Sequence, residues 1–132
     1  MEKSKASVSF APELIIPNGT TDVSFYERAF DATVNLRLTN DDLSIHVIEF
    51  SIGGAIFHLH ETTDATRFFP PTLHGGCTTC IGLFVEDVHQ VMQKAIEAGA
   101  TEADPVQDHE YGYRQGMIRD PFGHYWQIQK KI

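Results

Sequence analysis

A turn followed by a strand occurs twice in this chain, and that repeat restricts the possible folds more than any other feature. The second copy is Asp120–Ile128, where Asp, Pro and Gly suit a type I turn and the residues after Gly123 alternate between the two faces of a strand. The first copy, residues 53–60, begins with a glycine pair and alternates in the same way. Gly54 and Gly123 lie 69 positions apart. This spacing predicts two copies of one structural unit.

The predicted elements around these strands follow the same order in each half. We expect a first module over residues 8–61, a linker over 62–76 and a second module over 77–130. Each module is predicted as a strand, a helix and three further strands, which gives an α+β fold class with mostly antiparallel sheets. The expected strands are 8–16, 33–39, 43–52, 55–61, 77–86, 101–109, 111–119 and the one after Gly123, with helices capped at Thr20–Asp22 and at Asp87.

Alternation along the strand after Gly53-Gly54 predicts which of its side chains share a face. Phe57 falls on the side that a helix covers, and His58 and His60 fall on the opposite side. If Gly53-Gly54 is a two-residue turn, Glu49 pairs with His58. The pair is then an acid/base pair, part of a metal-binding cluster, or simply a cross-strand ion pair in a polar cavity. We expect one cavity lined by Glu49, His58, His60, Cys80 and Gln127.

Composition restricts the ligands and partners that the protein can have. The 132 residues carry a formal net charge of −8 with a pI near 5.2, which disfavours nucleic acid and anionic membranes and suits neutral or cationic small molecules. Hydrophobic residues make up 42%, enough for a packed core, but no apolar run is long enough to cross a bilayer. No apolar region typical of a secretory signal follows the first residues, which predicts a cytoplasmic location and reduced cysteines.

Three further groups have both a functional and a structural interpretation. Cys77 and Cys80 have the Cys-x-x-Cys spacing of zinc sites, although a single such pair is more often buried and unreactive. Arg114 is predicted to share the cavity side with Gly116 and Ile118, where it would bind an anionic group of a ligand. The alternative is an ordinary surface arginine. Tyr125 is predicted to help wall a ligand pocket.

The order of these motifs resembles a known family over about residues 10–130. The matching segments are Ser24-Phe25-Tyr26, residues 84–88, residues 98–100 and residues 119–126. In this order they resemble the vicinal oxygen chelate superfamily, which contains glyoxalases, bleomycin-resistance proteins and ring-cleaving dioxygenases. Residues 111–114 followed by Asp120–His124 resemble its PhnB-like branch. The resemblance implies paired βαβββ modules whose sheets form a cup, a homodimer, and in many members a divalent metal such as zinc, nickel, manganese or iron.

The resemblance also implies where a metal would be held. The positions that match the family's ligands are Ala11, His58, Cys80 and Gln127. Because Ala11 has no donor atom, the predicted metal site is incomplete. We therefore expect a protein that binds a small molecule in the cup, with His60, Arg114, Tyr125 and Gln127 as ligand-binding residues. The alternative is a divalent-metal-dependent lyase, isomerase or dioxygenase acting on a substrate with vicinal oxygens, with Glu49 and His58 as catalytic residues.

Overall fold

The computed structural model describes residues 7–132, and within them two halves have the same order of elements. The first contains β1 (Glu13–Ile16), α1 (Phe25–Phe30), β2 (Thr33–Thr39), β3 (Ile45–Ile52) and β4 (Ala55–Glu61). The second contains β5 (Ile81–Phe84), α2 (Val88–Glu97), β6 (Thr101–His109), β7 (Tyr113–Arg119) and β8 (Tyr125–Lys131), after a short 3-10 helix at Pro71–Leu73. The sheet orders are β1-β4-β3-β2 and β5-β8-β7-β6. The predicted α+β class and repeated order of strands are confirmed.

The strand register preserves the repeat at the level of single residues. β1 runs parallel to β4 with Glu13 opposite His58, and β5 runs parallel to β8 with Gly82 opposite Gln127. In the first hairpin the two-residue turn at Gly53-Gly54 pairs Glu49 with His58, as predicted. In the second hairpin Arg119 pairs with Tyr125, so five residues instead of two separate the strands, and Met117 rather than Ile118 lies opposite Gln127. The repeat therefore extends through the parallel strand pairs but shifts by one residue at β7.

Four of the expected strands are shorter than their sequence pattern indicates, and the first strand of each half is shortened the most. β1 begins at Glu13, directly after Pro12, which has no backbone N–H to donate to a neighbouring strand. The pairing is extended only by the carbonyl of Pro12, which accepts from the His58 amide at 2.8 Å. β5 begins at Ile81, so Cys80 lies just outside the sheet.

The helices follow local signals at their ends. In α2, the Asp87 side chain accepts from the backbone N–H of Gln90 at 3.0 Å, which caps the helix as predicted. Gly99 follows its C-terminus with φ of 122°, a conformation that favours glycine. α1 is shorter than expected because it begins after Ser24. No helix among residues 7–132 is both long and apolar enough to cross a membrane.

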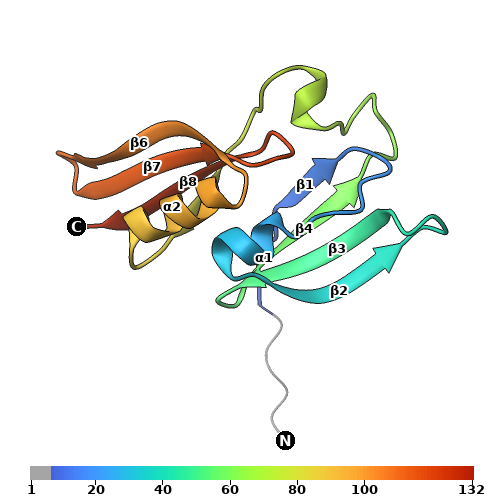
Figure 1. Cartoon of the computed structure of the whole chain (residues 1–132), viewed down its shortest axis with the longest axis horizontal. Coiled ribbons are helices and arrows are strands. Elements are labelled where there is room, and N and C mark those ends of the chain that lie inside the picture. The colour runs from blue at the N-terminus through green and yellow to red at the C-terminus, as the bar shows by residue number, and fades with distance from the viewer. Residues whose placement is uncertain (1–6) are drawn as a thin grey trace, which may run out of the picture.

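The two modules share one aromatic core. Figure 1 shows the modules side by side, with α1 next to α2 between them, and these helices are in contact. The ring of Tyr26 in α1 lies 5.3 Å from the ring of Phe57 and 5.9 Å from that of Trp126, centroid to centroid. Phe57 and Trp126 lie 5.2 Å apart in an edge-on arrangement. These rings come from both halves, so the core does not divide between the modules.

Asp120 is a buried charge at the centre of this core. Asp120 is only 3% exposed. Its Oδ2 accepts hydrogen bonds from the Tyr26 hydroxyl at 2.5 Å and from Trp126 Nε1 at 3.0 Å. Its Oδ1 accepts from the backbone N–H groups of Phe122 and His124 at 2.9 and 3.0 Å. The turn that Asp120 opens is thereby joined to α1 of the other module.

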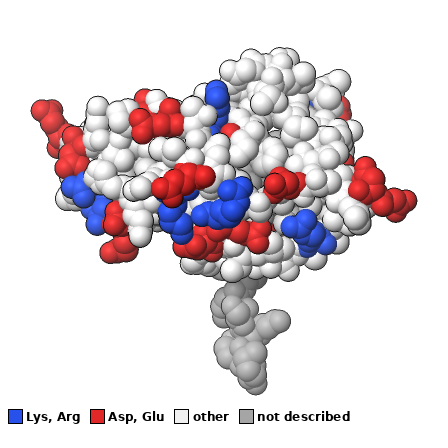
Figure 2. Space-filling view, viewed as in Figure 1, with Lys and Arg blue, Asp and Glu red and all other residues white. Residues whose placement is uncertain are grey.

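Surface contacts add to this connection between the modules. His124 Nε2 hydrogen bonds to the Ile15 carbonyl at 2.8 Å, and Lys94 Nζ lies 2.9 Å from Asp31 Oδ1. Arg28 Nη1 donates to the carbonyl of Ala98 at 3.0 Å. On the face in Figure 2, basic and acidic side chains are intermixed, without a continuous basic patch.

Candidate functional site

Each sheet has one face packed on the core and one face turned away from it, which we call the open face. In β4, Phe57 and Leu59 are buried on the core side, so His58 and His60 lie on the open face. In β8, Trp126 and Ile128 are buried in the same way, and Gln127 lies on the open face. The predicted assignment of these strand faces is confirmed.

The polar centre of the first open face is a chain of three side chains. Asn35 Nδ2 donates to Glu49 Oε2 at 2.9 Å, and His58 Nε2 lies 3.0 Å from Glu49 Oε1. The Asn35 hydrogen bond, followed by that of His58, lowers the pKa of the Glu49 carboxyl below its ordinary value. Glu49 is therefore a carboxylate at neutral pH and holds the imidazole of His58 in one orientation.

This arrangement leaves one nitrogen of His58 without a partner. Because a carboxylate can only accept hydrogen bonds, we assign the proton to His58 Nε2, and Nδ1 of the neutral ring then has a free lone pair. Nδ1 is buried and has no hydrogen-bond partner within residues 7–132, although the ring as a whole is partly exposed. An unpaired buried polar atom costs about 1–3 kcal/mol. A ligand that donates to Nδ1 would recover part of that cost.

Apolar surface surrounds the polar centre. Leu36 pairs with Glu49 and Leu38 pairs with Val47, and these leucines are 48% and 46% exposed. Beside His58 lies a hollow of about 550 Å³. Its lining includes Phe10, Ala11, Ile56, Phe57, His58, Gly82 and Leu83. A mainly apolar hollow with one fixed polar group is the usual form of a small-molecule site.

His60 lies further along the same strand. It lines a second hollow of about 430 Å³, together with Glu13, Ile15 and Phe68. Its Nδ1 is 2.7 Å from the carbonyl of Glu61, so its ring is held by the backbone rather than by Glu49. His58 and His60 thus share a face but have separate hydrogen-bond partners.

The open face of the second sheet is lined by amide side chains. Gln115 Nε2 donates to Gln129 Oε1 at 2.8 Å, and the Tyr111 hydroxyl donates to Gln115 Oε1 at 2.6 Å. Gln127 borders a hollow of about 290 Å³ on this face. Tyr125 borders a different hollow, of about 470 Å³, at the turn between β7 and β8.

The prediction that Arg114 lies on the cavity side is wrong. In β7, Gly116 pairs with Ile128, which is buried on the core side. A Cβ at Gly116 would meet the Met92 side chain of α2, so Arg114 shares the helix-covered face. There it makes two hydrogen bonds to the carboxylate of Asp108, at 2.7 and 3.1 Å.

Sequence reasoning missed the arginine that does lie on the open side. Arg119 pairs with Tyr125 and alternates with Ile118, which is fully buried. The signal was present in the sequence, because an apolar residue such as Ile118 marks the core side and places its neighbour on the other.

The cysteines differ from the expectation that they are buried, because Cys77 and Cys80 are both exposed and free. The Cys77 thiol donates to the carbonyl of Gly123 at 3.2 Å. Partial burial is the main cause that raises the pKa of the Cys77 thiol above its ordinary value. Cys77 is therefore a thiol rather than a reactive thiolate at neutral pH.

The metal that the family resemblance implies needs several converging donors. Within residues 7–132, no three His, Cys, Asp or Glu side chains lie close enough together to hold a metal ion. Of the four matching positions, Ala11 has no donor, and His58 uses its Nε2 on Glu49. The donors of one chain therefore do not fit a complete metal site.

Comparisons with known proteins agree with this fold. The family model of the Glyoxalase/Bleomycin resistance protein/Dioxygenase superfamily matches residues 13–128. An uncharacterized protein of Mycobacterium tuberculosis is 30% identical over 127 residues, which cover 94% of this chain and 75% of that protein.

Two solved structures cover nearly the whole chain. TioX from Micromonospora sp. ML1 is 25% identical with a TM-score of 0.68, and the match covers 95% of this chain and 97% of that one. The fosfomycin resistance protein FosX from Listeria monocytogenes is 15% identical with a TM-score of 0.70, and the match covers 97% and 96%. With the family match over residues 13–128, the chain belongs to the Glyoxalase/Bleomycin resistance protein/Dioxygenase superfamily.

Proposed function

We propose that the protein binds a small organic molecule on the open face of its first sheet, with His58 as the central polar contact. The observation that supports this most directly is the buried, unpartnered Nδ1 of His58, within residues 7–132. Glu49 and Asn35 hold the ring in place, so a ligand that donates a hydrogen bond to Nδ1 finds it already oriented. Leu36 and Leu38 supply apolar contact beside this centre.

The cup itself is proposed to form across a homodimer. Within one chain the two sheets are separate, and the modules meet through α1 and α2. The open faces carry exposed apolar side chains, including Leu36, Leu38 and Phe84, which is 57% exposed. A second copy would cover this apolar surface and place its second sheet opposite His58. Light scattering at micromolar concentration should then give twice the 14.8 kDa mass of one chain, and a monomer would contradict the dimer.

The open face of the second sheet is suited to a flat ligand that is neutral or cationic. Phe84, Tyr113, Tyr111 and His109 form a row of rings with successive centroids 6.1, 5.7 and 4.9 Å apart. The net charge of −8 favours a ligand that is not anionic at this face. Of the predicted ligand-binding residues, His60, Tyr125 and Gln127 stay in the proposal. Assignment to the PhnB-like branch stays a prediction.

A second candidate function is an enzyme, and the Glu49–His58 pair favours it. In a general base of this kind, a carboxylate binds one nitrogen of an imidazole, and the other imidazole nitrogen is free to accept a proton. His58 Nδ1 would accept a proton from the substrate, and Glu49 would stabilise the resulting imidazolium. The predicted divalent metal is not needed for this proton transfer.

A thermal-shift screen followed by calorimetry tests the binding proposal. We expect a ligand whose affinity falls at least about tenfold in His58→Ala, because one hydrogen bond to a fixed polar group is lost. His89→Ala, an exposed histidine on α2, is the matched control and should bind like the wild type. Equal binding by His58→Ala would refute the proposed site.

Chelator treatment and product analysis separate the two candidate functions. Metal content is first measured in protein purified without a histidine tag. Binding that survives chelator, with the ligand recovered unchanged, supports a binding protein. Turnover of the ligand that is lost in Glu49→Gln supports the enzyme. Stoichiometric metal that disappears in His58→Ala, together with binding abolished by chelator, would instead indicate a metalloenzyme.

A further inference from the structure

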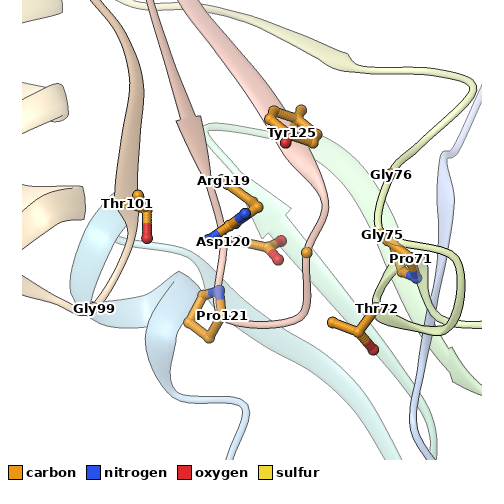
Figure 3. A pocket seen from close by; sticks show the side chains of 11 residues that line it. Pro71, Thr72, Gly75, Gly76, Gly99, Thr101, Arg119, Asp120, Pro121 and Tyr125 are labelled. Carbon is orange, nitrogen blue, oxygen red and sulfur yellow. The ribbon is translucent and has the colours of Figure 1, made fainter.

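A separate hollow lies at the turn between β7 and β8, and it contains the arginine that sequence reasoning missed. Its volume is about 470 Å³, and Arg119 borders it. Figure 3 shows the turn in the middle, with Gly99 and Thr101 on one side and Thr72 and Gly75 on the other. None of its lining residues borders the hollow beside His58. It is therefore a distinct feature from the proposed ligand site.

The side chains around this hollow are hydrogen-bond donors that the protein does not use. Within residues 7–132, no side-chain hydrogen bond or ion pair is formed by Arg119, nor by the hydroxyl groups of Thr72, Thr101 and Tyr125. Arg114, in contrast, makes two hydrogen bonds to the carboxylate of Asp108. A guanidinium and three hydroxyl groups thus border one hollow with their donors free.

The acidic neighbour of Arg119 does not occupy these donors. Asp120 also borders the hollow, but the four hydrogen bonds that its carboxylate accepts come from the turn and the core. Adjacent residues of a strand point to opposite faces, so Asp120 points to the core and Arg119 away from it. The positive charge of Arg119 is the one that a ligand in the hollow would meet.

Bare backbone forms the wall opposite Arg119. Gly75 and Gly76 border the hollow, and a Cβ built on either would meet no atom within 4 Å. Gly75 has φ of 73°, whereas Gly76 has an ordinary backbone conformation. A ligand can therefore approach the linker closely, and a side chain added at Gly76 would project into open space without backbone strain.

We propose that this hollow binds the carboxylate or phosphate group of a small molecule through Arg119. A guanidinium matches either group with two parallel hydrogen bonds, and hydroxyl groups supply further donors to its remaining oxygens. The assignment goes beyond the proposed function, because it uses other residues and takes a ligand group of opposite charge.

Titrations followed by NMR test the proposal on the full-length protein. The probes are inorganic phosphate and acetate, each added at constant ionic strength against sodium chloride. We expect saturable shifts of the Gly75, Gly76 and Thr101 amides with one of the two anions. Arg119→Ala should weaken that binding about tenfold or more, since a charged, bidentate partner is lost. Arg37→Ala, an exposed arginine on β2, removes the same charge elsewhere and should change nothing.

Two further variants test the position of the anion site and its independence from the site at His58. Gly76→Leu should block the hollow and abolish the same shifts while Arg119 is intact. His58→Ala should leave the anion binding unchanged, so failure of one proposal does not imply failure of the other. Saturation by phosphate alone assigns a phosphate group, and saturation by acetate alone assigns a carboxylate. Shifts that do not saturate, or that are the same in Arg119→Ala, would overturn the assignment.

Discussion

Removal of the Asp120 carboxylate is the most informative perturbation of this fold. In Asp120→Ala, the hydroxyl of Tyr26 and the indole N–H of Trp126 lose their acceptor inside the core, where these residues are 0% and 1% exposed. Each orphaned buried donor costs about 1–3 kcal/mol, so these two together cost about 2–6 kcal/mol, and loss of the turn hydrogen bonds from the N–H groups of Phe122 and His124 adds to this. Removing a buried charge offsets part of this cost, so we expect a loss of about 2–4 kcal/mol. Domains of this size have about 5–15 kcal/mol of total stability.

Urea denaturation followed by circular dichroism measures this loss. The m-value should stay constant, because the surface exposed on unfolding does not change. Asp120→Asn should cost less than Asp120→Ala, at about 1–3 kcal/mol, because its side-chain oxygen still accepts from the turn and mainly the Trp126 donor is left unpaired.

A double-mutant cycle with Tyr26→Phe tests the reasoning itself. In the wild type, Tyr26→Phe removes a hydrogen bond to a charged group and should cost about 1.5–3 kcal/mol. In the Asp120→Ala background the same change removes an orphaned hydroxyl and should be nearly neutral. If Tyr26→Phe costs the same in both backgrounds, within about 0.5 kcal/mol, the two groups are not coupled and the account is refuted.

Three other perturbations have expected outcomes. Burial, followed by the charge of Asp120, raises the pKa of Tyr26 well above 10.0, so above about pH 10 the folded state holds a proton that the unfolded state releases. The stability that Tyr26 contributes, measured in urea, should therefore be constant below about pH 10 and be lost above it, and the fall should be smaller in Tyr26→Phe. Hydrogen bonds from His46, at 2.8 Å, and from Asn18 lower the pKa of Glu61 below its ordinary value of 4.5. The stability that ionised Glu61 contributes should therefore be present above pH 4.5 and be lost as the pH falls below it. This acid-dependent loss should be absent from Glu61→Gln. Gly116→Ala should destabilise by about 1–3 kcal/mol in thermal unfolding, because its Cβ would lie 2.9 Å from Met92 Cε, and an unchanged melting temperature would show that this side chain repacks freely.

The parts of the fold that local patterns control could be predicted from the sequence. The glycine pair before β4 allows only one tight pairing, so Glu49 opposite His58 followed from the turn alone. The Asp87 cap likewise depends on a partner three residues away. Arg114 was misplaced because Ile118, which has the same parity, was assigned to the cavity side although it is fully buried on the core side. The longer second turn shifts the repeat by one residue at β7, which a strict comparison of the two halves does not show.

Features that depend on distant residues could not be predicted in this way. Asp120 was predicted to open a turn, and its bonds to Phe122 and His124 agree with that. Its partner Tyr26 lies 94 positions away, and no local pattern connects them. The unpartnered acceptor nitrogen of His58 and the unpaired Arg119 are likewise properties of the assembled sheets, because a sequence does not show which polar groups are left over after packing.

The buried carboxylate of Asp120 also makes this chain suitable for use as a split protein. A cut within the exposed part of the linker, near Arg67, would separate a fragment that carries the Tyr26 hydroxyl from one that carries Asp120. Each fragment alone would expose the shared aromatic core, and the second would expose a charge whose buried partner is missing. Reassembly would bury the aromatic core and restore the hydrogen bond between Tyr26 and Asp120 at the same time. If each fragment is fused to one of two test proteins, binding between the test proteins would therefore produce a folded domain that can be measured.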